Sequence, residues 1–233
     1  MNAYLSYNSK LKGNINSIID ISGSKSESNR LLILQQLYPN LQIDNVSNCN
    51  DTIVIQNALE SQEQVIDINH AGTAMRFLTA YFSTRQGSEI TLTGSERMKQ
   101  RPIKILVDAL KQLGADIEYL ENEGFPPLLI KGKELEKDEV ELNADISSQY
   151  ISALILIAPT LPNGLTIKLK GKITSKPYLM MSINLLQELG VNCTFFYKII
   201  KILPVYKIKA KKIIIESDWS SASYYYSLVA LSN

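Results

Sequence analysis

Small and hydroxyl residues combine with cations at several points of this sequence. One group is Gly23-Ser24-Lys25-Ser26, followed by Arg30, and another is Ala71-Gly72-Thr73, followed by Arg76. Each group leads into an apolar run, which is the pattern of a helix start. Helix starts carry free N–H groups and the positive end of the helix dipole, so they hold anions well. These groups therefore predict contacts with a negatively charged ligand.

A further group contains neutral donors. Ser147, Ser148 and Gln149 open an apolar run, and Ser175 and Tyr178 flank Pro177 at a later one. Hydroxyl and amide groups can bind a phosphate without adding charge. Helix capping alone explains the serines nearly as well, but it explains Gln149 less well.

The cations are placed where a helix dipole disfavours them. Lys25 and Arg30 fall near a first helical turn, where a cation is unfavourable unless an anion compensates it. Arg97, Lys99 and Arg101 follow one another closely, with Glu96 as their neighbouring carboxylate. An oxyanion is their natural counterpart, and a solvated basic loop is the alternative.

The overall composition limits the possible functions. Twenty-four basic and twenty-three acidic side chains give a net charge of +1, so we expect neither nucleic acid nor a membrane as a partner. Cys49, Cys193 and His70 are too few for a disulfide framework or a zinc site, and we expect no metal. The N-terminal residues lack a targeting pattern, and the apolar stretch from Ile151 to Pro159 is too short to cross a membrane, which predicts a cytoplasmic protein.

A long repeat predicts an α/β fold. Both copies read as a strand, a loop with proline, an amphipathic helix, a capping glycine and an alternating strand. The copies are Ile90–Gly94, Arg101–Ile103 and Leu113–Gly114, matched by Ile167–Gly171, Lys176–Tyr178 and Leu189–Gly190.

The last part of the sequence suggests an unfinished unit. Asp218-Trp219-Ser220-Ser221 echoes the earlier helix starts, and the helix expected over Tyr224–Leu231 has nothing downstream to bury it. We therefore expect the chain to be a fragment. Before this unit, Val205–Lys209 and Ile213–Glu216 are predicted as short strands.

Taken in order, these segments resemble the motifs of the 3-phosphoshikimate 1-carboxyvinyltransferase (EPSP synthase) family, over about Ile21 to Leu231. The resemblance implies the N-terminal domain of the enolpyruvyl transferase fold. That domain has three βαβαββ units in an inside-out, barrel-like arrangement, with helices inside and sheets outside. It implies a substrate-binding domain over residues 21–212, with residues 1–20 and 213–233 as a stub of a second domain.

The resemblance also implies site residues. For shikimate 3-phosphate these are Lys25, Ser26, Arg30, Ser147, Ser148, Gln149, Ser175 and Tyr178. For phosphoenolpyruvate they are Lys25, Gly72, Thr73, Arg97 and Gln149. His70 stands where the family often has asparagine, and we expect it to be a structural loop residue. The proton-transfer groups are expected in the second domain.

The implied reaction transfers the enolpyruvyl group to the 5-hydroxyl of shikimate 3-phosphate, without cofactor or metal, in a monomeric full-length enzyme. On this interpretation the chain alone is nearly inactive. One alternative is a non-catalytic anion-binding or split-protein module. Another is the enolpyruvyl transferase that acts on UDP-N-acetylglucosamine, whose first motif has asparagine after the lysine, where Ser26 stands here.

Overall fold

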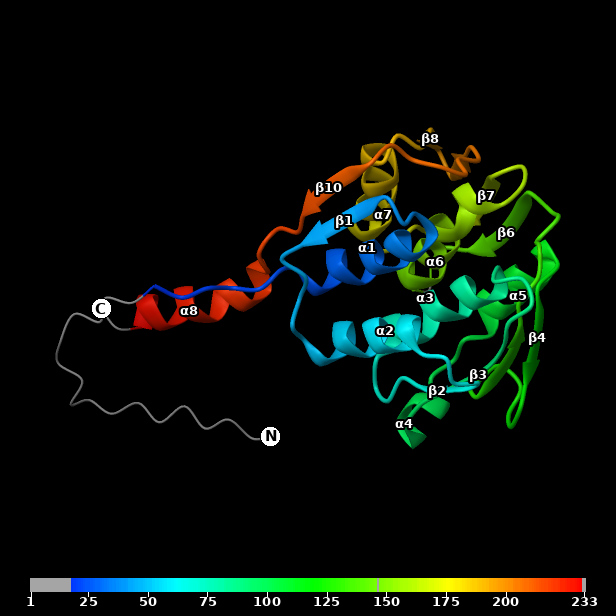
Figure 1. The fold of residues 1–233 in the computed structure, drawn as a ribbon, viewed down its shortest axis with the longest axis horizontal. Helices are drawn as coiled ribbons and strands as arrows, with labels where there is room; N and C mark the ends of the chain where they lie inside the picture. Colours follow the sequence, from blue (N-terminus) through cyan, green and yellow to red (C-terminus); the bar gives the residue numbers. More distant parts are fainter. Residues whose placement is uncertain (1–17, 146, 232–233) are drawn as a thin grey trace.

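The computed structural model describes residues 18–145 and 147–231, in which central helices are flanked by three sheets (Figure 1). Two of the central helices are almost wholly buried. In α3 (Gly72–Ser83) every side chain but Thr73 is buried, and in α6 (Ser148–Ile157) every one but Gln149. Helices inside and sheets outside agree with the arrangement that the resemblance implied.

The first complete unit runs from β2 to β5. It consists of β2 (Val65–Asp67), α3, β3 (Glu89–Thr93), α4 (Glu96–Lys99), α5 (Lys104–Leu113), β4 (Asp116–Tyr119) and β5 (Leu128–Lys131). The sheet order is β2-β3-β5-β4, with β2 parallel to β3 and the other pairs antiparallel.

The second complete unit has the same topology. It consists of β6 (Glu139–Asn143), α6, the 3₁₀ turn η1 (Ala158–Thr160), β7 (Leu165–Lys170), α7 (Lys176–Glu188), β8 (Cys193–Phe196) and β9 (Ile199–Ile202). Its order, β6-β7-β9-β8, repeats that of the first sheet. Gly114 and Gly190 follow the two equivalent helices with φ of 105° and 86°, the left-handed conformation expected of capping glycines. The predicted repeat is confirmed.

The remaining unit is smaller than expected. It contains α1 (Lys25–Leu37), β1 (Leu41–Asp44) and α2 (Asn50–Glu60), and β1 pairs in parallel with the distant strand β10 (Lys211–Ile214). Within the described residues this sheet has two strands and no hairpin, so only two of the three units are full βαβαββ copies. The three sheets stay separate and form no closed barrel among these residues.

The connection before β10 differs from the prediction. Val205–Lys209 was expected to be a strand, but it is irregular, and the strand expected at Ile213–Glu216 begins two residues earlier. The reason is that this segment bonds to carbonyls in and just after η1 instead of a neighbouring strand. The Val205 N–H donates to the Pro159 carbonyl at 2.8 Å, and the Tyr206 hydroxyl donates to that of Pro162 at 2.7 Å.

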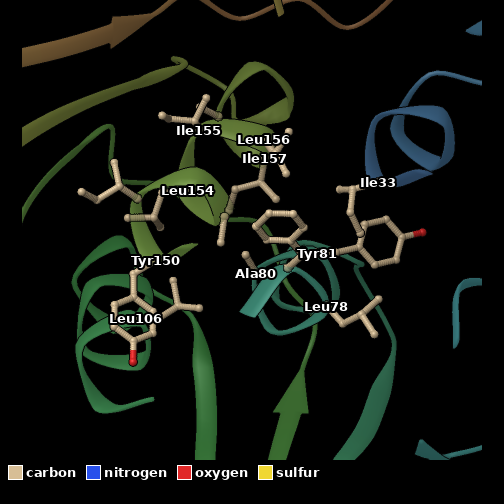
Figure 2. Close-up of a cluster of buried hydrophobic side chains, with 14 of the residues drawn as sticks. Ile33, Leu78, Ala80, Tyr81, Leu106, Tyr150, Leu154, Ile155, Leu156 and Ile157 are labelled. Carbon is tan, nitrogen blue, oxygen red and sulfur yellow. The ribbon is translucent and has the colours of Figure 1, made fainter. Parts of the chain in front are cut away.

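The core is formed where the central helices meet (Figure 2). Ile33 of α1, Leu78 of α3, Leu106 of α5 and Leu154 of α6 are all fully buried. Each such side chain contributes about 1.5–3 kcal/mol through burial. The helices are thereby fixed against one another, and so are their first turns.

Helix α8 (Trp219–Leu231) projects from this body and has no buried side chain (Figure 1). Residues 1–17 of the predicted stub lie outside the described residues. No helix in the described ranges has the length and apolar character needed to cross a membrane. The same ranges contain no group of three or more His, Cys, Asp or Glu side chains that could hold a metal.

Candidate anion-binding face

Hydrogen bonds between residues of the first two turns show that several helices start on the same side of the molecule. The Gln149 amide of α6 donates to the Thr73 hydroxyl of α3 at 3.1 Å. From α1, Arg30 donates through Nε to Ser182 of α7 at 2.8 Å and through Nη2 to Ser152 of α6 at 3.2 Å. The starts of α1, α3, α6 and α7 therefore lie together.

Two further helices join this group. The carbonyl of Pro102, just before α5, accepts hydrogen bonds from Arg76 Nη2 at 2.9 Å and from the Tyr150 hydroxyl at 2.7 Å. At the other side, Lys25 of α1 forms an ion pair with Asp51 of α2 at 3.3 Å. We call the side that carries the starts of α1, α2, α3, α5, α6 and α7 the helix-start face.

Most of these helix starts lack a side-chain cap. Ser147 accepts a hydrogen bond from the Gln149 N–H at 3.3 Å, but in the part of the chain that the structure describes no N-cap side chain caps α1, α2, α3, α5 or α7. Capping thus accounts for Ser147 and not for Ser24 or Ser175. Uncapped first turns keep N–H groups available, and their dipoles add in the same direction. The face is therefore suited to anions.

Arg30 is held inside the protein at this face. It is 3% exposed, and its guanidinium also donates to the carbonyls of Ser26 at 2.8 Å and Tyr178 at 3.3 Å. Burial lowers the pKa of Arg30 to about 10. The structure thus brings Arg30, Ser26 and Tyr178 together and joins Arg30 to α6 and α7.

The other predicted residues differ in exposure. Ser148 is buried, and its hydroxyl has no hydrogen-bond partner among the described residues. Tyr178 is 46% exposed, and Ser175 is exposed in a left-handed conformation with φ of 54°. Lys25 is half-exposed and pairs with Asp51, a carboxylate 26 positions away that its own sequence motif does not contain.

The cation-rich segment Arg97–Arg101 is partly neutralised. Lys99 pairs with Glu96 at 3.4 Å and with Glu121 at 2.9 Å. Glu121 lies beyond α5 in the sequence, so only Glu96 could be recognised as a neighbouring carboxylate. The expectation that Glu96 is the one carboxylate near these cations was therefore wrong for Lys99. Arg97 is exposed, and no hydrogen bond or ion pair joins it to the residues that the structure describes.

His70 supports a loop. Its Nδ1 lies 2.6 Å from the Ser95 hydroxyl, which accepts a hydrogen bond from the Met98 N–H at 3.3 Å and so caps α4. This contact agrees with a structural role for His70.

The arginines differ from the lysines in their partners. Every ion pair found among the described residues uses a lysine, and none uses any of the five arginines of the sequence. Four of these arginines, Arg30, Arg76, Arg97 and Arg101, lie at or near the helix-start face. Positive charge is thus left without carboxylate partners on the side where anions are favoured.

Ser152 and Ser182, which accept hydrogen bonds from Arg30, were not predicted from the sequence. The available signal was a hydroxyl within an apolar helix, a position where serine has no local reason to occur. A hollow of about 430 Å³ lies at the opposite helix ends, near Leu37, Thr84 and Thr160, and it includes none of the predicted site residues.

Comparisons with known proteins agree on one family. The family model described as EPSP synthase (3-phosphoshikimate 1-carboxyvinyltransferase) matches residues 41–233. A 3-phosphoshikimate 1-carboxyvinyltransferase of Bacteroides fragilis strain YCH46 is 48% identical over 219 residues, which cover 94% of this chain and 53% of that protein. One of Shewanella piezotolerans is 38% identical, with 93% of this chain and 58% of that protein covered. The chain thus spans about half the length of the curated relatives it matches.

Solved structures agree on the fold. An EPSP synthase from Acinetobacter baumannii superposes with a TM-score of 0.74 at 18% identity, over 89% of this chain and 51% of that one. At this identity the likeness concerns the fold alone.

Proposed function

Because this chain belongs to the 3-phosphoshikimate 1-carboxyvinyltransferase (EPSP synthase) family, we propose that its helix-start face binds shikimate 3-phosphate and part of phosphoenolpyruvate. The observation that carries the proposal is the hydrogen bond from Gln149 to Thr73. The resemblance assigns Gln149 to both substrates and Thr73 to phosphoenolpyruvate, and this bond joins the two residues. The two substrates would therefore meet between the starts of α6 and α3.

On this proposal, the phosphate of shikimate 3-phosphate lies near Ser147, Ser148 and Ser175. Two observations support this placement: the Ser148 hydroxyl has no hydrogen-bond partner among the described residues, and the N-cap side chain of α7 makes no capping hydrogen bond there. The shikimate carboxylate lies near Ser26 and Arg30, and Tyr178 packs on the ring. Lys25, Gly72, Thr73 and Arg97 face phosphoenolpyruvate.

The chemistry requires two multiply charged molecules to approach one another. Aligned helix starts and cations reduce their mutual repulsion and hold the reacting groups together. In the reaction, the methylene carbon of phosphoenolpyruvate is protonated while the 5-hydroxyl of shikimate 3-phosphate loses its proton and adds to the adjacent carbon. Phosphate then leaves as the new methyl group loses a proton, which restores the carbon–carbon double bond. Our proposal assigns this face to substrate binding and charge stabilisation, and it places the proton-transfer groups in the remaining half of the family polypeptide.

The domain organisation follows from the same proposal. Residues 21–212 form the substrate-binding domain, and residues 1–20 and 213–233 belong to a second domain. The exposed apolar surface of α8 supports the latter assignment, since a helix that is apolar all round is normally buried. We further propose a cytoplasmic location, which suits two free cysteines, and a monomeric full-length enzyme.

Calorimetric titration with shikimate 3-phosphate tests the binding site. The unmodified chain should bind, and the double variant Ser147→Ala, Ser148→Ala should bind about tenfold or more weakly because two phosphate donors are lost. The matched control is Ser223→Ala, Ser227→Ala on exposed helix α8, which should leave the affinity unchanged. Failure of the unmodified chain to bind, or equal losses in both double variants, would contradict the proposal.

An assay of phosphate release separates binding from turnover. With both substrates and no second polypeptide, we expect negligible release, because the proposed site lacks its proton-transfer groups. Release at a normal enzymatic rate would show that the chain alone contains them.

A further inference from the structure

We propose that Arg76 is a positioning residue of this site, which holds the loop 100–103 between α4 and α5 against the start of α3 and so fixes the cations around that loop where an anion binds. The inference rests on the proposed function for the identity of the anion, phosphoenolpyruvate. The contacts of Arg76 rest on the structure alone.

The guanidinium of Arg76 joins the start of α3 to the loop 100–103. Its Nη1 donates to the Gly72 carbonyl in the first turn of α3 at 3.1 Å, and its Nη2 donates to the Pro102 carbonyl in the loop at 2.9 Å. Nη1 also lies 3.9 Å from the sulfur of Met98 in α4. Because the guanidinium is planar and rigid, its two bonds fix the loop and the helix start relative to one another.

A second side chain bonds to the same carbonyl. The Tyr150 hydroxyl of α6 donates to the Pro102 carbonyl at 2.7 Å. The ring of Tyr150 lies beside Arg76, with 5.7 Å between its centroid and the Arg76 Cζ. Donors from α3 and α6 thus hold one carbonyl of the loop, which uses both of its lone pairs.

Stability alone does not favour a cation at this position. Arg76 is 4% exposed, and its Nε has no hydrogen-bond partner in the described ranges. It also forms no ion pair with the carboxylates that the structure describes. Burial lowers the pKa of Arg76. A buried charge without a counter-charge is costly, and an apolar side chain would suit a core position better. A role in the site explains the arginine where packing does not.

The loop brings a cation to the first turn of α3. The guanidinium of Arg101 lies against Gly72, since a Cβ atom built on this glycine would lie 2.6 Å from its Nη2 and 2.8 Å from its Cζ. Arg76 bonds to the Gly72 carbonyl on one side of this contact and to the carbonyl of the residue after Arg101 on the other. A loop released from Arg76 would therefore move Arg101 away from the N–H groups of the helix start. Preorganised cations bind anions with less loss of conformational entropy.

Titrations with inorganic phosphate and with phosphoenolpyruvate, followed by ¹H–¹⁵N NMR of the full chain, test the inference. In the unmodified chain each ligand should saturably shift the amide signals of Gly72 and Thr73. Arg76→Gln removes the bridge and should weaken both ligands about tenfold. Arg76→Lys keeps the charge and one donor, and it should recover part of the affinity.

Leu78→Ala is the control for a general loss of stability. Leu78 is fully buried in the core of the same helix (Figure 2). Its truncation should destabilise the chain but leave both affinities within about twofold.

Amide hydrogen exchange gives a readout that needs no ligand. The N–H groups of Arg101 and Ile103 donate to the carbonyls of Met98 and Gly124 at 2.9 and 2.8 Å. In Arg76→Gln these two amides should exchange about tenfold faster relative to the core amide of Leu154, because the loop is no longer held. In Leu78→Ala this ratio should stay constant.

Three results would overturn the inference. The first is equal phosphate and phosphoenolpyruvate affinities in Arg76→Gln and the unmodified chain, and the second is an equal loss in Leu78→Ala. The third is the absence of saturable shifts in the unmodified chain. If Arg76→Gln loses its native spectrum, Tyr150→Phe decides. It removes the other donor to the Pro102 carbonyl and should weaken phosphate about threefold, and an unchanged affinity would overturn the inference.

Calorimetry with shikimate 3-phosphate separates this inference from the proposed function. The Arg76 variants should bind shikimate 3-phosphate within about twofold of the unmodified chain, because neutral donors are proposed to hold its phosphate. A tenfold loss for this ligand as well would show that Arg76 supports the whole face instead of the loop, and would contradict the inference. An unmodified chain that does not bind shikimate 3-phosphate would refute the proposed function and leave the phosphate result standing.

Discussion

The side-chain amide of Gln149 donates a hydrogen bond to the hydroxyl of Thr73 at 3.1 Å, across 76 positions of sequence. Thr73 is the one residue of α3 that is not buried, and Gln149 is the one residue of α6 that is not buried. Both lie in the first turn of their helix. The contact joins the first turns of α3 and α6 where the two substrates are proposed to meet. The same hydrogen bond therefore joins two packed helices and orients two residues that are proposed to bind substrate.

Removal of this contact should affect binding more than stability. Thr73→Val deletes the acceptor, and the half-buried Gln149 amide can turn to water, so we expect a loss of about 0.5–1 kcal/mol in the free energy of unfolding. Phosphoenolpyruvate binding should weaken about threefold to tenfold, because Gln149 is no longer oriented. Thr73→Ser keeps the hydroxyl and is the control. Urea unfolding and calorimetry measure the two effects, and equal behaviour of the two variants would contradict this account.

The support of Arg30 should show in stability. Ser182→Ala removes a hydroxyl that accepts from the buried guanidinium at 2.8 Å, and we expect a loss of about 1.5–3 kcal/mol. Ser83→Ala is the matched control. Ser83 is also fully buried in a helix, but its hydroxyl bonds to the carbonyl of Thr79 in its own helix. If the free energy of unfolding falls no more in Ser182→Ala than in Ser83→Ala, the contact with Arg30 does not contribute to stability.

Alkaline pH should destabilise the chain through Cys193. Burial raises the pKa of the Cys193 thiol to about 12, so the thiol stays neutral in the folded chain while the unfolded chain releases its proton above about pH 9. The unfolded state then binds fewer protons, and the free energy of unfolding falls as pH rises from about 9 towards 12. Between pH 8 and 10 we expect the free energy of unfolding to fall by about 1 kcal/mol less in Cys193→Ala than in the unmodified chain.

Cys49→Ala is the control for this pH effect. Burial opposes ionisation of Cys49, but hydrogen bonds from Ser47 and Thr52 outweigh burial and lower its pKa. Ionisation of Cys49 is therefore favoured in the folded chain, and its removal should not reduce the alkaline loss. Chemical unfolding at both pH values measures these differences. A steeper pH dependence in Cys193→Ala would show that the sign is wrong.

The exposed helix α8 should promote self-association. Leu228 and Leu231 are 47% and 77% exposed, so Leu228→Lys with Leu231→Lys should reduce concentration-dependent association in sedimentation velocity. The free energy of unfolding should change by no more than about 0.5 kcal/mol, because α8 buries no side chain. Val65→Lys, on an exposed apolar residue of β2, is the control. Unchanged association in the double variant would assign the behaviour to another surface.

Local chemistry made much of the fold predictable. The helix starts at Lys25, Gly72 and Ser148, and the capping glycines Gly114 and Gly190, depend on neighbouring residues in the sequence and appear where expected. The repeated order of elements follows from the same signals. These features need no knowledge of tertiary contacts.

Other features depend on residues far apart in the sequence. The partners of Arg30, Ser152 and Ser182, look like isolated hydroxyls in apolar helices, and their role exists only once α1, α6 and α7 pack. Glu121 reaches Lys99 only after the chain folds back beyond α5. The segment Val205–Lys209 has the composition of a strand, but it pairs with none of the strands that the structure describes.

The position of Arg101 against Gly72 illustrates the same difficulty. In the sequence, Arg101 forms one cluster with Arg97 and Lys99. The three cations differ in the structure: one is exposed, one pairs with carboxylates, and one lies on the start of α3. Spacing alone could not distinguish them.

The parallel pairing of β1 with β10 also affects the order of events during synthesis. Leu41 pairs with Lys211, and the Tyr38 hydroxyl donates to the Val205 carbonyl at 2.7 Å. Strand β1 leaves the ribosome early, but its sheet can form only after β10 has been synthesised. In the meantime α1 has neither the strand that completes its unit nor the serines of α6 and α7 that hold Arg30. Nascent chains that end before β10 should thus expose α1, and a chaperone could bind this segment during translation.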